Sequence, residues 1–116
     1  MNRPRLVLEG GPTQVAVARA FAGAVMRVLE LDDERVAAIR LAVSELVTQL
    51  VLDGADTLEL QLDGEVLRLA RAPSGITLAP PVLEPARMDV VSRCRVGAPT
   101  PNAVGGWDLP LQEMPA

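Results

Sequence analysis

Residues 57–71 read T-L-E-L-Q-L-D-G-E-V-L-R-L-A-R, and apolar and polar side chains alternate on both sides of Asp63-Gly64. Strict alternation is the pattern of a half-buried strand, and an Asp-Gly pair between two such runs predicts a two-residue hairpin turn. The expected cross-strand pairs are Leu60 with Leu67, Leu58 with Leu69, and Glu59 with Arg68. One side of the hairpin is therefore expected to be buried and the other to face solvent.

Two long helices are predicted before the hairpin. The first is expected over residues 13–30 with Thr13 as its N-cap, and the second follows Asp32 and runs to about Leu52. The second helix has one apolar stripe, made of Val36, Ile39, Val43, Val47 and Leu50. The first has apolar residues on two faces, which indicates that it is covered on two sides.

Shorter elements are predicted on either side of this region. They are a strand over residues 5–9, an extended or loop segment over 73–84, a short helix over 86–94, a loop over 97–106, and a final strand containing Trp107, Leu109 and Leu111. Because Pro110 lacks a backbone N–H, the final strand is expected to lie at an edge of the sheet or to end there. The order predicts an α+β two-layer sandwich, in which an antiparallel or mixed sheet of about four or five strands has helices on one face.

Composition is typical of a single folded domain. The chain has 116 residues, of which 49% are hydrophobic and 22% charged, and we expect one domain over residues 1–116 with its core over about 3–112. The net charge of -4 argues against nucleic acid as a partner. Cys94, the single cysteine, cannot form an internal disulfide, which fits a reducing cytosol. It is expected to be a small core residue, and Trp107 a core or edge anchor.

The missing residue types exclude several kinds of chemistry. The chain has no His and no Lys, since all 11 cationic residues are Arg. A Ser-His-Asp triad, a His-ligated metal and a Schiff-base lysine are therefore impossible on this chain.

The most apolar segment, residues 15–29, bears on membranes and on assembly. It is interrupted by Arg19 and Arg27 and is too short to span a bilayer, and no signal-type segment is visible. We therefore expect a cytoplasmic protein with no membrane contact. The width of the apolar surface predicts a homodimer that forms through the first helix or the first strand.

The segment R-L-A-V-S-E-L-V-T-Q, residues 40–49, resembles the N-box helix of the GHKL family, the histidine-kinase-like ATPases. It is most similar to the branch of bacterial anti-sigma-factor serine kinases, whose order of elements also resembles the order predicted above. The resemblance implies Mg-ATP as cofactor, with Glu45 polarising the attacking group and Gln49 at the position of the Asn that holds magnesium. It further implies that Gly75 belongs to the first glycine box, and Arg87 would be a phosphate contact.

Three departures from the family pattern predict that nucleotide binding is lost. Gln49 is one methylene longer than the family's Asn, and Mg²⁺ tolerates little change in ligand geometry. Where the family places an Asp that hydrogen-bonds adenine, this chain has Pro73 or Ala72, neither of which accepts a hydrogen bond through its side chain. In the second glycine box, Pro85 has no amide to offer a phosphate and Glu84 adds a repelling charge.

These observations lead to one hypothesis and two alternatives. The hypothesis is a degenerate anti-sigma-factor-like regulatory domain that binds a protein, either a sigma factor or an anti-sigma antagonist, and has no catalytic residue, metal or cofactor. The first alternative is an active ATP-dependent serine kinase that uses Glu45 as base and Gln49 at the metal. The second is an accessory structural subunit unrelated to sigma factors. A plainer reading of Glu45 and Gln49 makes them the solvated edge of an amphipathic helix.

Overall fold

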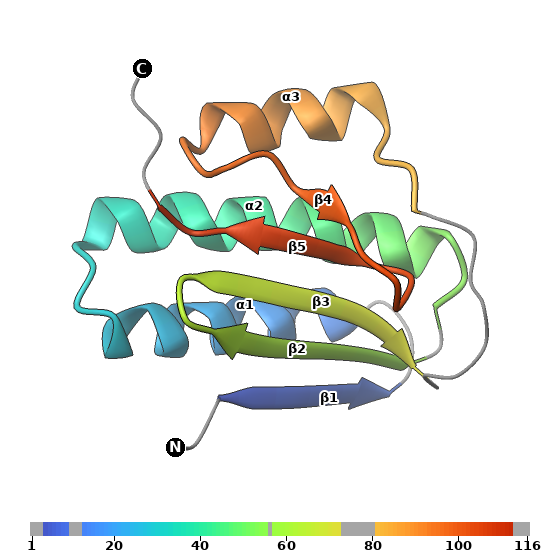
Figure 1. Ribbon diagram of the computed structural model, residues 1–116, viewed down its shortest axis with the longest axis horizontal. Coiled ribbons are helices and arrows are strands. Elements are labelled where there is room, and N and C mark those ends of the chain that lie inside the picture. The colour runs from blue at the N-terminus through green and yellow to red at the C-terminus, as the bar shows by residue number, and fades with distance from the viewer. Residues whose placement is uncertain (1–3, 10–12, 56, 73–80, 113–116) are drawn as a thin grey trace.

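The computed structural model describes residues 4–9, 13–55, 57–72 and 81–112, which form an α+β structure of two layers (Figure 1). In chain order the elements are β1 (Arg5–Glu9), α1 (Thr13–Val28), α2 (Asp33–Leu52), β2 (Thr57–Asp63), β3 (Val66–Ala72), α3 (Pro85–Arg93), β4 (Thr100–Pro101) and β5 (Trp107–Pro110). Within the described residues the five strands form one antiparallel sheet in the order β1-β2-β3-β5-β4. The predicted fold class is confirmed.

The helices lie on one face of this sheet. α1 and α2 run side by side across it, and α3 packs against α2 near the β4 edge (Figure 1). Along β2 the leucines Leu58, Leu60 and Leu62 are buried, and the residues between them are partly exposed. The alternation predicted from the sequence therefore separates a helix-covered face from an open face.

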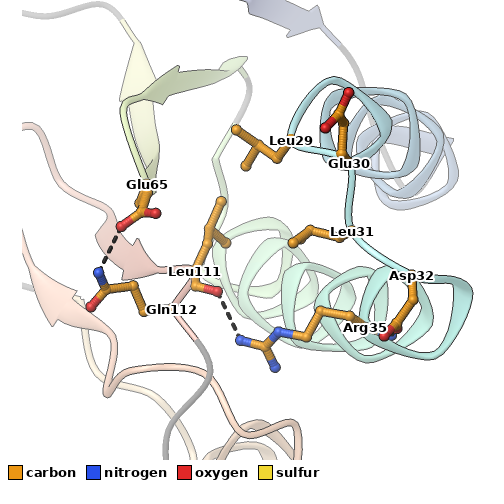
Figure 2. Close-up of a pocket in the computed structure, with 8 residues that line it drawn as sticks. All are labelled: Leu29, Glu30, Leu31, Asp32, Arg35, Glu65, Leu111 and Gln112. Carbon is orange, nitrogen blue, oxygen red and sulfur yellow. Dashed lines mark hydrogen bonds between the residues drawn. The ribbon is translucent and has the colours of Figure 1, made fainter.

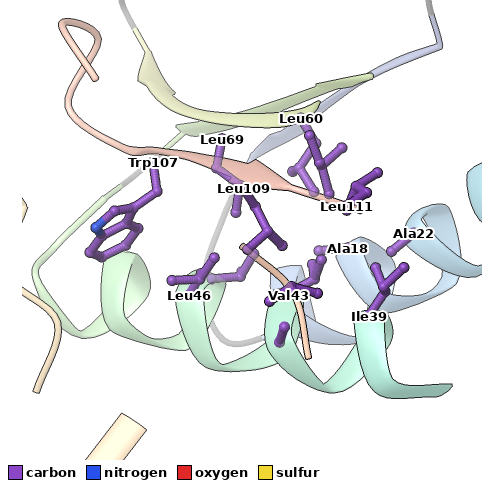
Figure 3. Packing of buried hydrophobic residues seen from close by; sticks show 14 of the residues in the cluster. Ala18, Ala22, Ile39, Val43, Leu46, Leu60, Leu69, Trp107, Leu109 and Leu111 are labelled. Atoms are coloured by element: carbon purple, nitrogen blue, oxygen red, sulfur yellow. The ribbon is translucent and has the colours of Figure 1, made fainter. Parts of the chain in front are cut away.

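Aliphatic side chains fill the space between the sheet and the helices (Figure 3). The buried residues that meet there include Leu60, Leu69, Trp107 and Leu109 from the sheet, Ala18 and Ala22 from α1, and Ile39, Val43 and Leu46 from α2. Trp107 belongs to this core, as predicted, and so is not available as a platform for a ligand.

The β2–β3 hairpin turns one residue later than predicted. Asp63 pairs with Val66, so that Gly64 and Glu65 are the central turn residues. Gly64 has a φ of 62°, which a two-residue hairpin turn requires at its first central position and which glycine adopts without strain. The predicted register is therefore wrong, and the observed pairs include Leu62 with Leu67, Leu60 with Leu69, and Gln61 with Arg68. Because faces alternate with a period of two, every side chain still lies on its predicted face.

The C-terminal strands differ from the prediction. Residues 97–106 contain the two-residue strand β4 in place of a continuous loop, and β5 therefore lies between β3 and β4 rather than at an edge. β5 does end at Pro110, where the missing N–H predicts an end. The carbonyl of Pro110 accepts a hydrogen bond from Gly97 N at 3.2 Å.

Capping residues set the ends of the two long helices. Asp32 caps α2 as predicted, since its Oδ1 accepts a hydrogen bond from Arg35 N at 2.8 Å. α1 ends in a Schellman motif, in which Leu31 N donates to Met26 O at 3.4 Å and Glu30 N donates to the residue 27 carbonyl at 3.1 Å. Glu30 takes a φ of 58° there, in the left-handed region that favours glycine.

Replacing Glu30 by glycine is expected to raise the free energy of unfolding by about 0.5–1 kcal/mol, because glycine relieves the left-handed strain. Urea denaturation monitored by circular dichroism measures this change. Arg19→Gly, at an exposed position inside α1, serves as the control and is expected to lower the same free energy by about 1 kcal/mol. Destabilisation by Glu30→Gly would show that the Glu30 side chain makes a compensating contact.

The structure covers α1 on one side. Ala18, Ala22 and Met26 are fully buried against the rest of the chain, while Val17 is 45% exposed and Val28 is 69% exposed. The second apolar face predicted for this helix is thus left largely open within the described residues, and only Phe21 on it is partly buried against the core. Among the helices described, none has the length and apolarity needed to cross a bilayer.

Candidate functional site

Three of the side chains singled out in the sequence meet between α2 and α3. Glu45 and Gln49 lie one helical turn apart on α2, and both bond to the start of α3. Arg87 Nη1 donates to Glu45 Oε2 at 3.1 Å, and the backbone N–H of Glu84 donates to Gln49 Oε1 at 3.1 Å. We call Glu45, Gln49, Glu84 and Arg87 the α2–α3 seam.

Gln49 is a buried polar residue with partners at both ends of its amide. It is 4% exposed, and its Nε2 donates to Oδ1 of Asp53, the C-cap residue of α2, at 3.2 Å. The side chains of Glu45 and Arg87 are each 22% exposed. The reading of Glu45 and Gln49 as a solvated helix edge is therefore wrong, because Gln49 is almost fully buried and most of the Glu45 side chain is withdrawn from solvent.

The residues at the start of α3 explain why the Glu84 N–H bonds to Gln49. Pro85 occupies the first turn with a preset φ and no N–H, and Glu84 is the N-cap residue but makes no side-chain capping bond. The side chain that could accept the Glu84 N–H within α3 would be the one at position 87, but Arg87 is only a donor, so this N–H takes its acceptor from Gln49 on α2. This partly buried bond contributes about 0.5–1.5 kcal/mol and ties the residue at which α3 begins to α2.

The seam does not fit the magnesium nucleotide that the resemblance places here. Gln49 Oε1, the atom that would bind Mg²⁺, already accepts the Glu84 N–H, and the Glu45 carboxylate is paired with Arg87. In the described part of the chain, no three His, Cys, Asp or Glu side chains are grouped to hold a metal ion. Gly75 and Pro73 lie outside the described residues, and no catalytic step through a nucleotide follows from this arrangement.

The Glu45–Arg87 pair is expected to contribute to stability as a pair. In a double-mutant cycle with Glu45→Ala and Arg87→Ala, we expect a coupling of about 1 kcal/mol, because both groups are largely withdrawn from water. The cycle is measured by urea denaturation at low salt. Asp89 and Arg93, an exposed pair within α3, are the matched control and should couple by no more than about 0.5 kcal/mol. Equal coupling in the two cycles would contradict the structural role of the seam.

Sequence reasoning missed Arg35, which ties three elements together. Its Nη1 donates to Cys94 O at 2.9 Å and its Nη2 donates to Leu111 O at 2.8 Å, so the start of α2 is joined to the ends of α3 and β5. A cation in the first turn of a helix interacts unfavourably with the helix dipole. The position of Arg35 in the first turn of α2 was therefore the one sequence feature that could have indicated a special role for it. Cys94 is buried as predicted, and burial raises the pKa of its thiol.

Comparison with known protein families and curated proteins gives no match for this chain.

Proposed function

We propose that this chain is a degenerate anti-sigma-factor-like regulatory domain of the GHKL type, which acts by binding a protein and does not use ATP. The observation that carries the proposal is the α2–α3 seam. The two α2 side chains that an active relative would turn toward Mg-ATP are here hydrogen-bonded to α3. A domain in which these two side chains bond to Glu84 and Arg87 would lack the kinase chemistry. Its outer surfaces would still be free to bind a protein partner.

The kinase alternative requires two things that the seam opposes. Glu45 would have to leave Arg87 in order to act on a serine hydroxyl, and Gln49 would have to release the Glu84 N–H in order to bind a metal ion. Both changes would detach the start of α3 from α2. We therefore prefer the binding role, whose partner would be a sigma factor or an anti-sigma antagonist, in the cytoplasm.

We also propose that the protein forms a homodimer through α1 or β1. Val17 and Val28 leave apolar surface on the outside of α1, and β1 is an edge strand whose outer side is unpaired within the described sheet. Either surface would be covered by a second copy of the chain.

Co-purification tests the binding role. A tagged copy expressed in the native organism should retain a defined protein, identified by mass spectrometry, and the amount retained should be the same with and without Mg-ATP. The accessory-subunit alternative predicts a partner from a structural assembly in place of a transcription regulator. Release of the partner by Mg-ATP, or transfer of phosphate to it, would overturn the proposal in favour of the kinase.

A further inference from the structure

A pocket of about 440 Å³ opens at one end of the molecule, away from the seam (Figure 2). It lies where the connection between α1 and α2 meets the β2–β3 turn and the residues that follow β5. Its size is within the range of about 300–1,000 Å³ that is usual for small-ligand sites, so it can hold one or two side chains of a bound segment.

The floor of this pocket is apolar. Leu29 and Leu31, on the α1–α2 connection, are partly buried and pack on the core, and Leu111 after β5 is 4% exposed. In Figure 2 the three side chains extend toward the same space between the connection and the β2–β3 turn. The partial exposure of Leu29 and Leu31 leaves apolar area that an aliphatic side chain would remove from water, at about 25 cal/mol per Å².

The rim of the pocket is negatively charged. Three acidic residues, Glu30, Asp32 and Glu65, line it against one cation, Arg35. In Figure 2 the Glu65 carboxylate lies across the pocket from the α1–α2 connection, and the Glu30 and Asp32 carboxylates point outward from the connection. Both Nη atoms of Arg35 donate to main-chain carbonyls, which directs this cation toward the protein rather than toward a ligand. Glu65 accepts a hydrogen bond from Gln112 at 2.7 Å, and a carboxylate can accept several.

The apolar floor and the acidic rim together indicate which kind of ligand the pocket can bind. The carboxylates repel phosphates and other anions, and across the described residues no side chains are grouped for a metal ion. A segment with an apolar side chain between two cationic ones complements both the leucine floor and the acidic rim. The net charge of -4 on the chain adds to the attraction for a basic partner.

We propose that this pocket docks a basic segment of a protein partner, with an aliphatic side chain on the leucine floor and Arg or Lys side chains near Glu30 and Glu65. The inference rests on the proposed function, because it assigns a surface to protein binding. It uses none of the seam residues, so the pocket and the loss of ATP binding are tested separately.

A blocked pentapeptide, R-A-L-A-R, provides the probe. Titrated into the full ¹⁵N-labelled chain, it is expected to shift the amide signals of the residues around the pocket, Leu29 to Asp32, Glu65 and Leu111. The peptide R-A-S-A-R, which lacks the apolar anchor, should bind at least about fivefold more weakly. The peptide E-A-L-A-E should give no shift, because it reverses the charge.

Protein variants complete the test. Glu30→Gln with Glu65→Gln removes two rim charges and should weaken R-A-L-A-R binding about fivefold, which is the effect of two exposed charge pairs. Glu9→Gln with Asp89→Asn removes two exposed charges elsewhere and should change binding by less than about twofold. Both double variants should keep the melting temperature within a few degrees. Shifts outside the pocket, equal binding of E-A-L-A-E, or no shift at millimolar peptide would overturn the proposal and leave the ATP prediction standing.

Discussion

Gly106→Ala is expected to lower the free energy of unfolding by about 3 kcal/mol or more, which would be one of the largest effects of any single methyl group in this protein. A Cβ at position 106 would lie 2.0 Å from the carbonyl oxygen of Leu69 in the middle of the sheet. That oxygen belongs to a strand paired on both sides and cannot move freely. Thermal melting should show a midpoint lower by at least about 10 °C.

Gly54→Ala is the matched control for this steric effect. Gly54 has a φ of 89° and nothing within 4 Å of an added Cβ, so its substitution introduces backbone strain without a clash. It is expected to cost about 1–2 kcal/mol, clearly less than Gly106→Ala. An equal or smaller loss at Gly106 would contradict the close approach of the β4–β5 turn to β3.

Gln49→Ala is expected to lower the free energy of unfolding by about 2–3 kcal/mol. The substitution removes the acceptor of the Glu84 N–H and the donor to Asp53, and it leaves a small void where the buried Gln49 side chain was. Urea denaturation gives the stability. Amide hydrogen exchange should also show faster exchange in α3, because this helix loses its polar attachment to α2.

Gln49→Asn distinguishes the structural role of the Gln49 amide from a role in binding a nucleotide. Asparagine restores the residue type of the active family but is too short to reach both Glu84 and Asp53, so we expect a loss of about 1–2 kcal/mol. Thr48→Ala, at the preceding position of α2, is the control and should change stability by less than about 0.5 kcal/mol. Unchanged stability in Gln49→Asn would contradict the double attachment of the Gln49 amide.

The fold was predictable because its signals are local. Alternation defined β2 and β3, and an acid before an apolar run defined the start of α2 at Asp32. The register failed because Asp63-Gly64 and Gly64-Glu65 both offer a plausible turn, and the conformation of Gly64 decides between them. β4 has two residues and no pattern of its own, since its place depends on Asn102, whose Oδ1 accepts bonds from Val104 N at 3.1 Å and Gly106 N at 3.0 Å.

Three residues of the seam were candidates from the sequence, but their arrangement was not predictable. The family resemblance of residues 40–49 indicated Glu45 and Gln49, and the same resemblance implied Arg87 as a phosphate contact. Their direct bonds across α2 and α3 depend on a distant segment docking at one angle, which no local pattern encodes. Arg35 was missed for the same reason, because its partners Cys94 and Leu111 lie far along the chain.

Thermal melting with and without about 1 mM Mg-ATP tests the central claim, that the seam takes the place of a nucleotide site. A ligand at a hundred times its dissociation constant stabilises a protein by about 2.7 kcal/mol, which corresponds to a rise of roughly 10 °C for a domain of this size. We predict no ATP-specific rise for the chain or for Gln49→Asn. A clear rise with Mg-ATP that Glu45→Ala abolishes would contradict the account and identify the chain as a nucleotide-dependent kinase.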